Sequence, residues 1–210
     1  ISAVGDITAE ELGPILDDLL GDLPAGSALE TAPLELNIPA GLTVVDMPTP
    51  QSVAIFGHRG IDRADPDFFA AFILNTILGG QGIESRLTAE VREKRGLTYG
   101  ISTVLISKDQ ANVMLGQVAS ANDRINAAIE VIRDEWRKLA RDGVTAEELQ
   151  AAQTYLTGAY PLRFDGNSQI SRILVGMQRI GLGLDYINTR NAKINAVTLS
   201  EINQVAAQLL

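Results

Sequence analysis

Patterns typical of β-strands and of α-helices occupy different parts of this chain, and that separation limits the folds open to it. Residues 99–106 and 111–119 are two strand-like runs joined by a short polar stretch, a spacing that predicts an antiparallel hairpin. After residue 119 every periodic segment has helical spacing. Early strands with short connections, followed by grouped helices, predict an α+β fold: an antiparallel or mixed β-sheet with helices packed on one face.

Helix-capping motifs mark several helix starts. Capping boxes, in which a Thr hydroxyl and a Glu three residues later bond to each other's backbone N–H, begin at Thr8, Thr145 and Thr198. The first predicts a helix with one apolar face that ends near Gly21. Apolar positions at helical spacing predict further helices from about 125 to 142 and around residues 170–177.

The middle of the chain carries two further helix signals and one strand signal. Asp65-Pro66 predicts a helix start, and that helix should end at Gly79-Gly80. A second helix should run from about 84 to 95, with Gly96 as its left-handed cap. The continuous apolar run from Val53 to Phe56 favours a strand covered on both faces.

Two stretches near the N-terminus, residues 1–6 and 25–32, bear on domain organisation. Residues 1–6 have the pattern of the middle of a strand and include no initiator methionine, and residues 25–32 are the best linker candidate. We therefore expect residues 1–210 to form a single C-terminal domain, a fragment whose N-terminal part is missing.

Charge and hydropathy exclude two classes of partner. A formal net charge of −9 and the lack of a basic cluster argue against nucleic acid. No apolar run is long enough to span a bilayer, and the N-terminus lacks a signal-peptide pattern. We expect a soluble protein without a membrane span, and the compartment stays open between the bacterial cytoplasm and periplasm.

The inventory of catalytic side chains is small. His58 is the single histidine and there is no cysteine, so no zinc set and no His-Glu-x-x-His or His-x-x-Glu-His helix can be built, and we expect no metal site in this chain. No Gly-x-Ser-x-Gly elbow is present. Residues 79–82 are Gly-Gly-Gln-Gly but lack the Lys-Ser/Thr of a phosphate loop, which favours a helix terminator.

One stretch carries a specific resemblance. Leu78-Gly79-Gly80, then Ser85-Arg86-Leu87, then residues 92–99, Arg-Glu-Lys-Arg-Gly-Leu-Thr-Tyr, follow one another in this order. This segment resembles the metal-free C-terminal domain of the insulinase, pitrilysin and mitochondrial processing peptidase family of zinc proteases. The resemblance extends more weakly over the whole chain, including the opening residues, the Asp-Pro-Asp helix start and the later Thr-Ala-Glu-Glu-Leu turn.

The resemblance implies a zinc endopeptidase built from paired α+β domains, of which this chain would be the half without zinc. It assigns Arg92, Tyr99, Gly79 and Gly80 to substrate binding, with Arg92 and Tyr99 supporting the transition state and no catalytic residue in this chain. Zinc would lie in a paired domain of the same parent chain or in a partner subunit, and the full-length protein would form a homo- or heterodimer. The isolated chain would be inactive.

The chemistry of the residue pair agrees with such a role. A guanidinium and a phenol both donate hydrogen bonds, and the turn at Gly96 can bring the end of a helix and the start of a strand, opened by Tyr99, to one edge. Two well-placed donors can hold peptide carbonyls and stabilise oxyanion charge. The alternative for the pair is a surface ion pair between Arg92 and a neighbouring Glu, with Tyr99 half-buried in the strand.

Three functions remain open from the sequence. The first is the substrate-binding half of a zinc endopeptidase. The second is a non-catalytic structural or assembly subunit of the same fold, which the intact Arg92/Tyr99 motif disfavours. The third is an unrelated α+β binding module. The peptide substrate depends on domains outside this sequence, and the acidic balance suggests only a preference for basic peptides.

Overall fold

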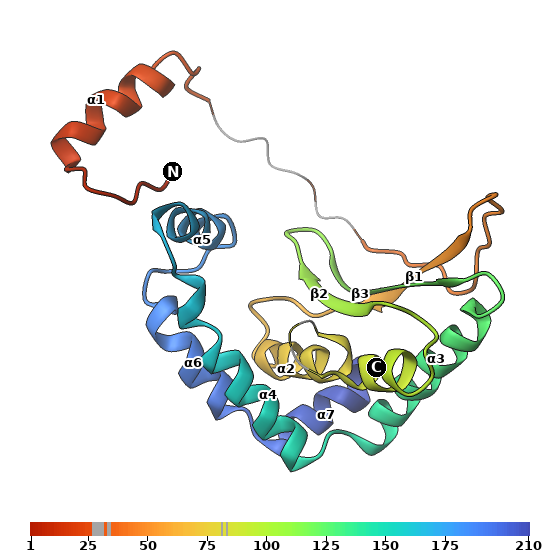
Figure 1. Ribbon diagram of the computed structural model, residues 1–210. Coiled ribbons are helices and arrows are strands. Elements are labelled where there is room, and N and C mark those ends of the chain that lie inside the picture. The colour runs from red at the N-terminus through yellow and green to blue at the C-terminus, as the bar shows by residue number, and fades with distance from the viewer. Residues whose placement is uncertain (27–31, 33–34, 81, 83) are drawn as a thin grey trace. The chain divides into compact units, whose positions relative to one another are not determined.

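The computed structural model describes residues 1–26, 32, 35–80, 82 and 84–210 (Figure 1). The chain divides into two compact units, residues 34–158 with 189–210, and residues 1–33 with 159–188. The larger unit contains the sheet and most helices: β1 Gln51–Arg59, α2 Phe68–Gly79, the π-helix η1 Thr88–Glu93, β2 Ile101–Ser107, β3 Asn112–Ala121, α3 Ile125–Asp142, α4 Ala146–Gly158 and α7 Leu199–Leu209. The smaller unit contains α1 Ala9–Leu20, the 3-10 turn η2 Pro161–Arg163 and α5 Asn167–Arg179, and α6 Tyr186–Ala196 runs from one unit into the other.

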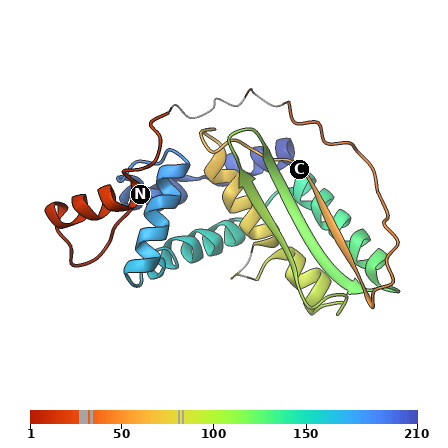
Figure 2. The same cartoon turned by 90° about the horizontal axis from the view of Figure 1, so that it is seen from above.

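The sheet of the larger unit is antiparallel, in the order β1-β3-β2. The predicted hairpin is β2–β3, in register from Ile101 opposite Val118 to Ser107 opposite Asn112. Helices α2, α3 and α7 lie on one side of the sheet (Figures 1 and 2). The predicted α+β class, with an antiparallel sheet and helices on one face, is confirmed.

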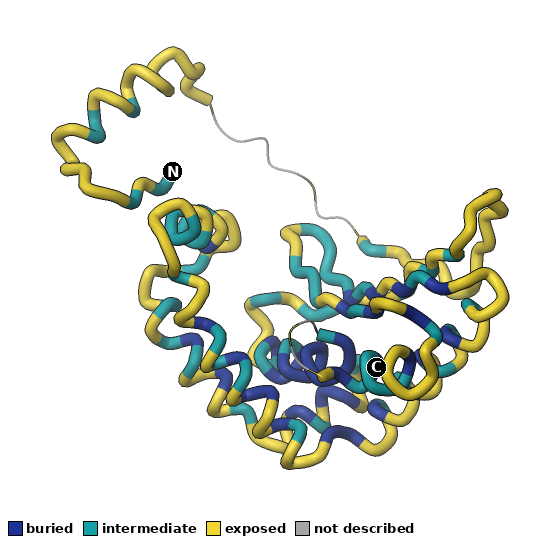
Figure 3. Tube along the Cα trace, in the orientation of Figure 1, coloured by how far each residue is buried: buried dark blue, intermediate teal, exposed yellow. Residues whose placement is uncertain are grey.

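Helix α2 is the centre of the core. The helix is apolar on all its sides, and nearly every residue from Phe68 to Gly79 is buried (Figure 3). Ile73, Leu74 and Leu78 are completely inaccessible to solvent. The helix ends at Gly79-Gly80 as predicted, but begins at Phe68 rather than at Pro66, because the Asp65 carboxylate accepts from the Asp67 N–H in a turn that precedes it.

The prediction that β1 is covered on both faces is wrong. Its residues alternate between exposed and partly buried, and Val53 and Ile55 are 58% and 72% exposed. The reason is that the helices cover only one face, so a continuous apolar run places half of its side chains on the open face.

The strand predicted for residues 1–6 is also not found, since none of these residues pairs with a strand. Within the smaller unit the opening segment is held by side chains of α5 instead: Gln178 donates to the Ile1 carbonyl and Ser171 to the Ser2 carbonyl. Helix α1 has both capping-box bonds between Thr8 and Glu11, but none of its residues is buried (Figure 3). The predicted linker, residues 25–32, lies largely outside the described residues.

None of the helices in the described parts of the chain is long and apolar enough to cross a membrane.

Candidate functional site

Arg92 lies on η1, a π-helical turn rather than the α-helix predicted for residues 84–95. The Lys94 N–H donates to the Ala89 carbonyl, five residues back, at 2.9 Å. π-helical turns are uncommon and occur often at functional sites, because the extra residue per turn redirects a side chain. The helix then ends as predicted, with Gly96 at φ +59° and its N–H donating to the Arg92 carbonyl.

Arg92 lines an open groove of about 670 Å³. The described residues that line it are Gly80, Gly82, Glu84, Thr88, Arg92, Glu93 and Ile101. The guanidinium is half exposed, and its Nε lies 3.4 Å from the Glu93 carboxylate, which is also half exposed. This contact is the surface ion pair anticipated as the alternative for Arg92. It contributes little in solvent, so it leaves most of the donors of Arg92 available to a ligand.

Tyr99 does not open a strand as predicted. It lies in a bend two residues before β2 and is 93% exposed. The buried Thr98 explains why β2 begins two residues later than predicted: the Thr98 hydroxyl donates to the Ala119 carbonyl and accepts from the Gly100 N–H. That side chain replaces the backbone pairing that would otherwise extend the strand. Tyr99 is therefore neither half-buried nor among the described lining of the groove, and its phenol faces solvent.

Gly79 and Gly80 have different surroundings. Gly79 is buried where α2 meets β2, and a Cβ there would lie 2.6 Å from Thr103 Oγ1 and 3.0 Å from the Thr103 backbone nitrogen. Close packing of helix on strand therefore accounts for Gly79. Gly80 lines the groove with Arg92. The structure thus brings two of the four predicted residues, Arg92 and Gly80, to one groove.

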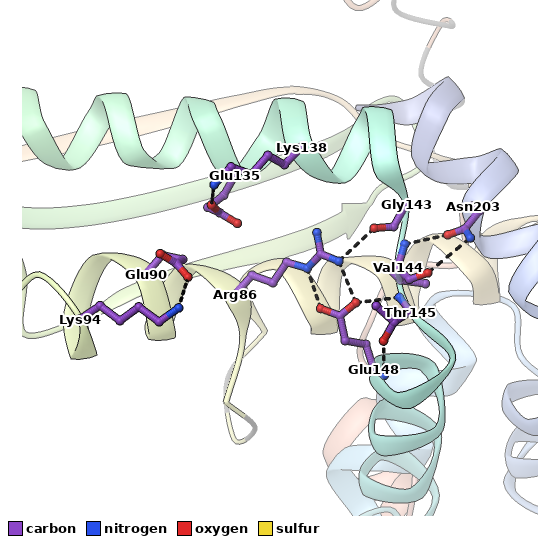
Figure 4. Close-up of polar contacts among 10 residues, drawn as sticks. All are labelled: Arg86, Glu90, Lys94, Glu135, Lys138, Gly143, Val144, Thr145, Glu148 and Asn203. Atoms are coloured by element: carbon purple, nitrogen blue, oxygen red, sulfur yellow. Dashed lines mark hydrogen bonds and ion pairs between the residues drawn. The ribbon is translucent and has the colours of Figure 1, made fainter.

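The helical segment that carries Arg92 is anchored to the turn between α3 and α4 by an ionic clamp, which we define as Arg86 with Glu148 (Figure 4). Arg86 donates from Nε and Nη2 to the two carboxylate oxygens of Glu148 at 2.6 and 2.7 Å, and from Nη2 to the Gly143 carbonyl at 2.9 Å. Glu148 also accepts from the Thr145 N–H at 2.8 Å, so one carboxylate serves both the capping box of α4 and the clamp.

The pKa values of the clamp residues follow from these bonds. Burial would raise the pKa of Glu148, but hydrogen bonds from Arg86 and from the Thr145 N–H outweigh it, and the pKa of Glu148 is lowered. The hydrogen bond to Glu148 raises the pKa of Arg86 against the opposing effect of burial. Both groups are therefore charged at neutral pH.

Two further contacts fix the same region (Figure 4). The Asn203 side chain of α7 accepts from the Val144 N–H at 2.7 Å and donates to the Val144 carbonyl. On η1, Glu90 pairs with both Lys94 and Arg95, and hydrogen bonds from these two cations lower its pKa. The sequence indicates no role for Arg86, Glu90 or Asn203. Arg86 belongs to the Ser85-Arg86-Leu87 motif and Glu148 to a capping box, but neither pattern indicates a partner 62 residues away.

The described residues of this chain do not fit a zinc ion. No group of three or more His, Cys, Asp or Glu side chains that could hold a metal occurs among the residues that the structure describes. His58 Nδ1 donates to the Arg59 carbonyl at 2.7 Å, and the ring packs edge-on against Trp136 at 5.6 Å. The single imidazole is thus part of the packing between β1 and α3.

An antiparallel sheet with helices on one side and a cationic side chain in an open groove defines an α+β domain. Residues 1–156 match the sequence family described as the Peptidase M16 inactive domain. The chain belongs to that family, which confirms the family resemblance of the sequence.

Known relatives agree with this assignment. An uncharacterized zinc protease of Mycobacterium tuberculosis is 29% identical over 216 residues, covering 100% of this chain and 49% of the relative. A non-peptidase homolog of Helicobacter pylori is 25% identical over 95% of this chain and 46% of its own length. The crystal structure of a peptidase M16 inactive domain from Pseudomonas fluorescens superposes with a TM-score of 0.80 at 28% identity, over 98% of this chain and 49% of that one. The chain spans about half the length of the relatives it matches.

Proposed function

We propose that this chain is the substrate-binding, metal-free C-terminal domain of a zinc-dependent endopeptidase. The zinc would be held by a paired domain, either in the same parent protein or in a partner subunit. The length of the relatives, about twice that of this chain, and their description as zinc proteases support this arrangement. Hydrolysis itself is assigned to the zinc-bearing domain, and the role of this chain is to hold and orient the peptide.

The observation that carries the proposal is the position of Arg92 in the groove. A peptide lying there would present carbonyl oxygens, and a guanidinium with several unused N–H groups can bind them without requiring any change of protonation at neutral pH. Gly80, which lines the same groove, has no side chain to obstruct the approach of a peptide backbone.

Tyr99 would contribute a second donor from the bend that follows. Its hydroxyl faces solvent, because the ring is almost fully exposed and contributes little to the core. Aromatic residues that are exposed on loops are frequent in binding sites, since they supply apolar area together with one polar group. We assign Tyr99 to a contact with substrate that forms only when the peptide is bound.

The test is peptide turnover by the assembled protease, in which this domain is joined to its zinc-bearing partner. Arg92→Ala should lower kcat/KM by about 100-fold, the size expected for one donor to a developing oxyanion. Tyr99→Phe should lower it by about 3- to 10-fold, as expected for a neutral hydrogen bond. Zinc content should be unchanged in both variants.

Arg141→Ala is the matched control. Arg141 is also an exposed arginine with a carboxylate partner, Asp142, but it lies at the end of α3 and does not line the groove. Its replacement should leave turnover unchanged. Full activity of both Arg92→Ala and Tyr99→Phe would refute the assignment of the site.

A second function, a non-catalytic assembly subunit of the same fold, is favoured by one comparison, the Helicobacter pylori relative described as a non-peptidase homolog. The paired domain distinguishes the two functions. A partner domain with a His-x-x-Glu-His helix and bound zinc supports the protease, and a partner without one supports the assembly subunit.

A further inference from the structure

A second cavity lies between the edge strand β1 and α3, with Gly41 and Leu42 from the segment before β1 also in its wall, on residues that the Arg92 groove does not use. We name it the α3–β1 groove; its volume is about 370 Å³, within the range of small-molecule sites. The residues that determine its chemistry are Phe56, Ile129, Ile132, Arg133, Trp136 and Arg137.

The floor of this groove is apolar and rigid. Trp136 packs edge-to-face against Phe56, with ring centroids 5.8 Å apart and an interplanar angle of 82°, and it packs edge-to-face against His58 as well, at 5.6 Å. Ile132 is buried beneath. Two edge-on aromatic contacts fix the orientation of the indole, so the apolar surface is formed before any ligand arrives.

The polar side of the groove is cationic. Arg133 and Arg137 lie one helical turn apart on α3 and both line the groove, whereas their ion-pair partners Glu130 and Asp134 are not among its lining residues. Each of these ion pairs uses a single guanidinium nitrogen, Nη1, at 2.9 and 3.2 Å. A guanidinium has five N–H donors, so each arginine keeps donors that have no protein acceptor in the described part of the chain.

An apolar cavity with two guanidinium groups at one side is complementary to a molecule with an apolar body and an anionic head. We propose that the α3–β1 groove binds an aliphatic carboxylate, with its chain against Phe56, Ile132 and Trp136 and its carboxylate between Arg133 and Arg137. Two guanidinium forks fit a planar carboxylate with charge-assisted hydrogen bonds, whereas the apolar floor alone would not discriminate between head groups. None of the described residues that line this groove lines the Arg92 groove.

The chain offers a direct probe, because Trp136 is its single tryptophan and lies in the groove. Decanoate, titrated below its micelle concentration, should change the Trp136 fluorescence in a saturable manner. 1-Decanol, which has the same chain without the charge, should bind about tenfold more weakly, since it lacks the charge-assisted hydrogen bonds. Unchanged far-UV circular dichroism during the titration will show that the fluorescence does not report unfolding.

The variant Arg133→Gln/Arg137→Gln should weaken decanoate binding by about tenfold and leave decanol binding as it was. Arg141→Gln, which removes a cation of α3 outside the groove, is the control and should bind decanoate normally. A titration that does not saturate, equal binding of decanoate and decanol, or full decanoate affinity in the double variant would each overturn the proposal. A decanoate titration that does not saturate is also the result expected if the groove instead takes an apolar side chain of another protein.

Discussion

Removal of Glu148 should destabilise the larger unit more than the loss of an ordinary helix cap. The side chains of Arg86 and Glu148 are only 19% and 29% exposed. Breaking a fully buried pair by removing one partner costs about 3–5 kcal/mol. Because part of the Arg86 guanidinium still reaches water, we expect roughly 2–3 kcal/mol from the stranded charge. Loss of the cap bond to Thr145 adds about 1 kcal/mol, so Glu148→Ala should cost about 3–4 kcal/mol.

Urea unfolding followed by Trp136 fluorescence measures this effect, since Trp136 lies in the same unit as the clamp. With an m-value of about 2 kcal/mol/M, the midpoint should fall by roughly 1.5–2 M. Glu201→Ala is the matched control, because Glu201 closes the equivalent capping box of α7 with Thr198 and pairs with no arginine in the part of the chain that the structure describes. Its midpoint should fall much less.

A double-mutant cycle isolates the pair. Arg86→Ala/Glu148→Ala should be less destabilised than the sum of the two single variants, because removing both charges leaves neither of them stranded. Equal midpoints for Glu148→Ala and Glu201→Ala, together with additive effects of Arg86→Ala and Glu148→Ala, would refute the reasoning that the clamp anchors the Arg92 segment.

Two further predictions concern pH and glycine. The pKa of Glu148 is lowered in the folded state, so the stability that Glu148 contributes is complete above its unfolded pKa and is lost as the pH falls through its folded pKa. The difference in urea midpoint between wild type and Glu148→Ala should therefore be full at pH 7 and shrink at acid pH, below the ordinary carboxyl pKa. A midpoint difference that stays constant with pH would contradict this prediction. Gly79→Ala, whose methyl would meet Thr103, and Gly143→Ala, at φ +72° with the new Cβ against Asn203 Oδ1, should each cost about 1–3 kcal/mol by thermal unfolding. Gly13→Ala in α1, where a new Cβ would meet no described atom beyond the neighbouring backbone of its own helix, should be neutral or stabilising.

The features that the sequence predicted well are local. The capping boxes at Thr8, Thr145 and Thr198 all form both of their bonds, because four consecutive residues contain every atom involved. The left-handed cap at Gly96 and the β2–β3 hairpin are equally short-range. Such features are decided by local geometry, so tertiary packing does not alter them.

The features that the sequence missed depend on packing. The pattern of β1 could not show that helices cover only one face of the sheet. Helix α6 was not predicted, since its sequence is mostly polar and, of its residues, only Arg190 and Ile194 are fully buried. The π-turn of η1 has no sequence signature among the patterns considered. The Arg86–Glu148 clamp has none either, because its two segments meet only in the folded chain.

The candidate site was predicted in part. Arg92 was identified through the family motif, and the structure places it with Gly80 in a groove. Gly79 is accounted for by its contact with Thr103, and the exposed Tyr99 lies outside the groove lining. The roles of Arg92 and Tyr99 toward a peptide stay predictions, because they depend on a substrate and a paired domain.

Metal analysis combined with a peptidase assay tests the central claim most directly. The 210-residue chain alone should hold no stoichiometric zinc and hydrolyse no peptide, and hydrolysis should occur only when the chain is joined to a zinc-bearing M16 domain. One tightly bound zinc per isolated chain, together with peptide hydrolysis, would contradict the account.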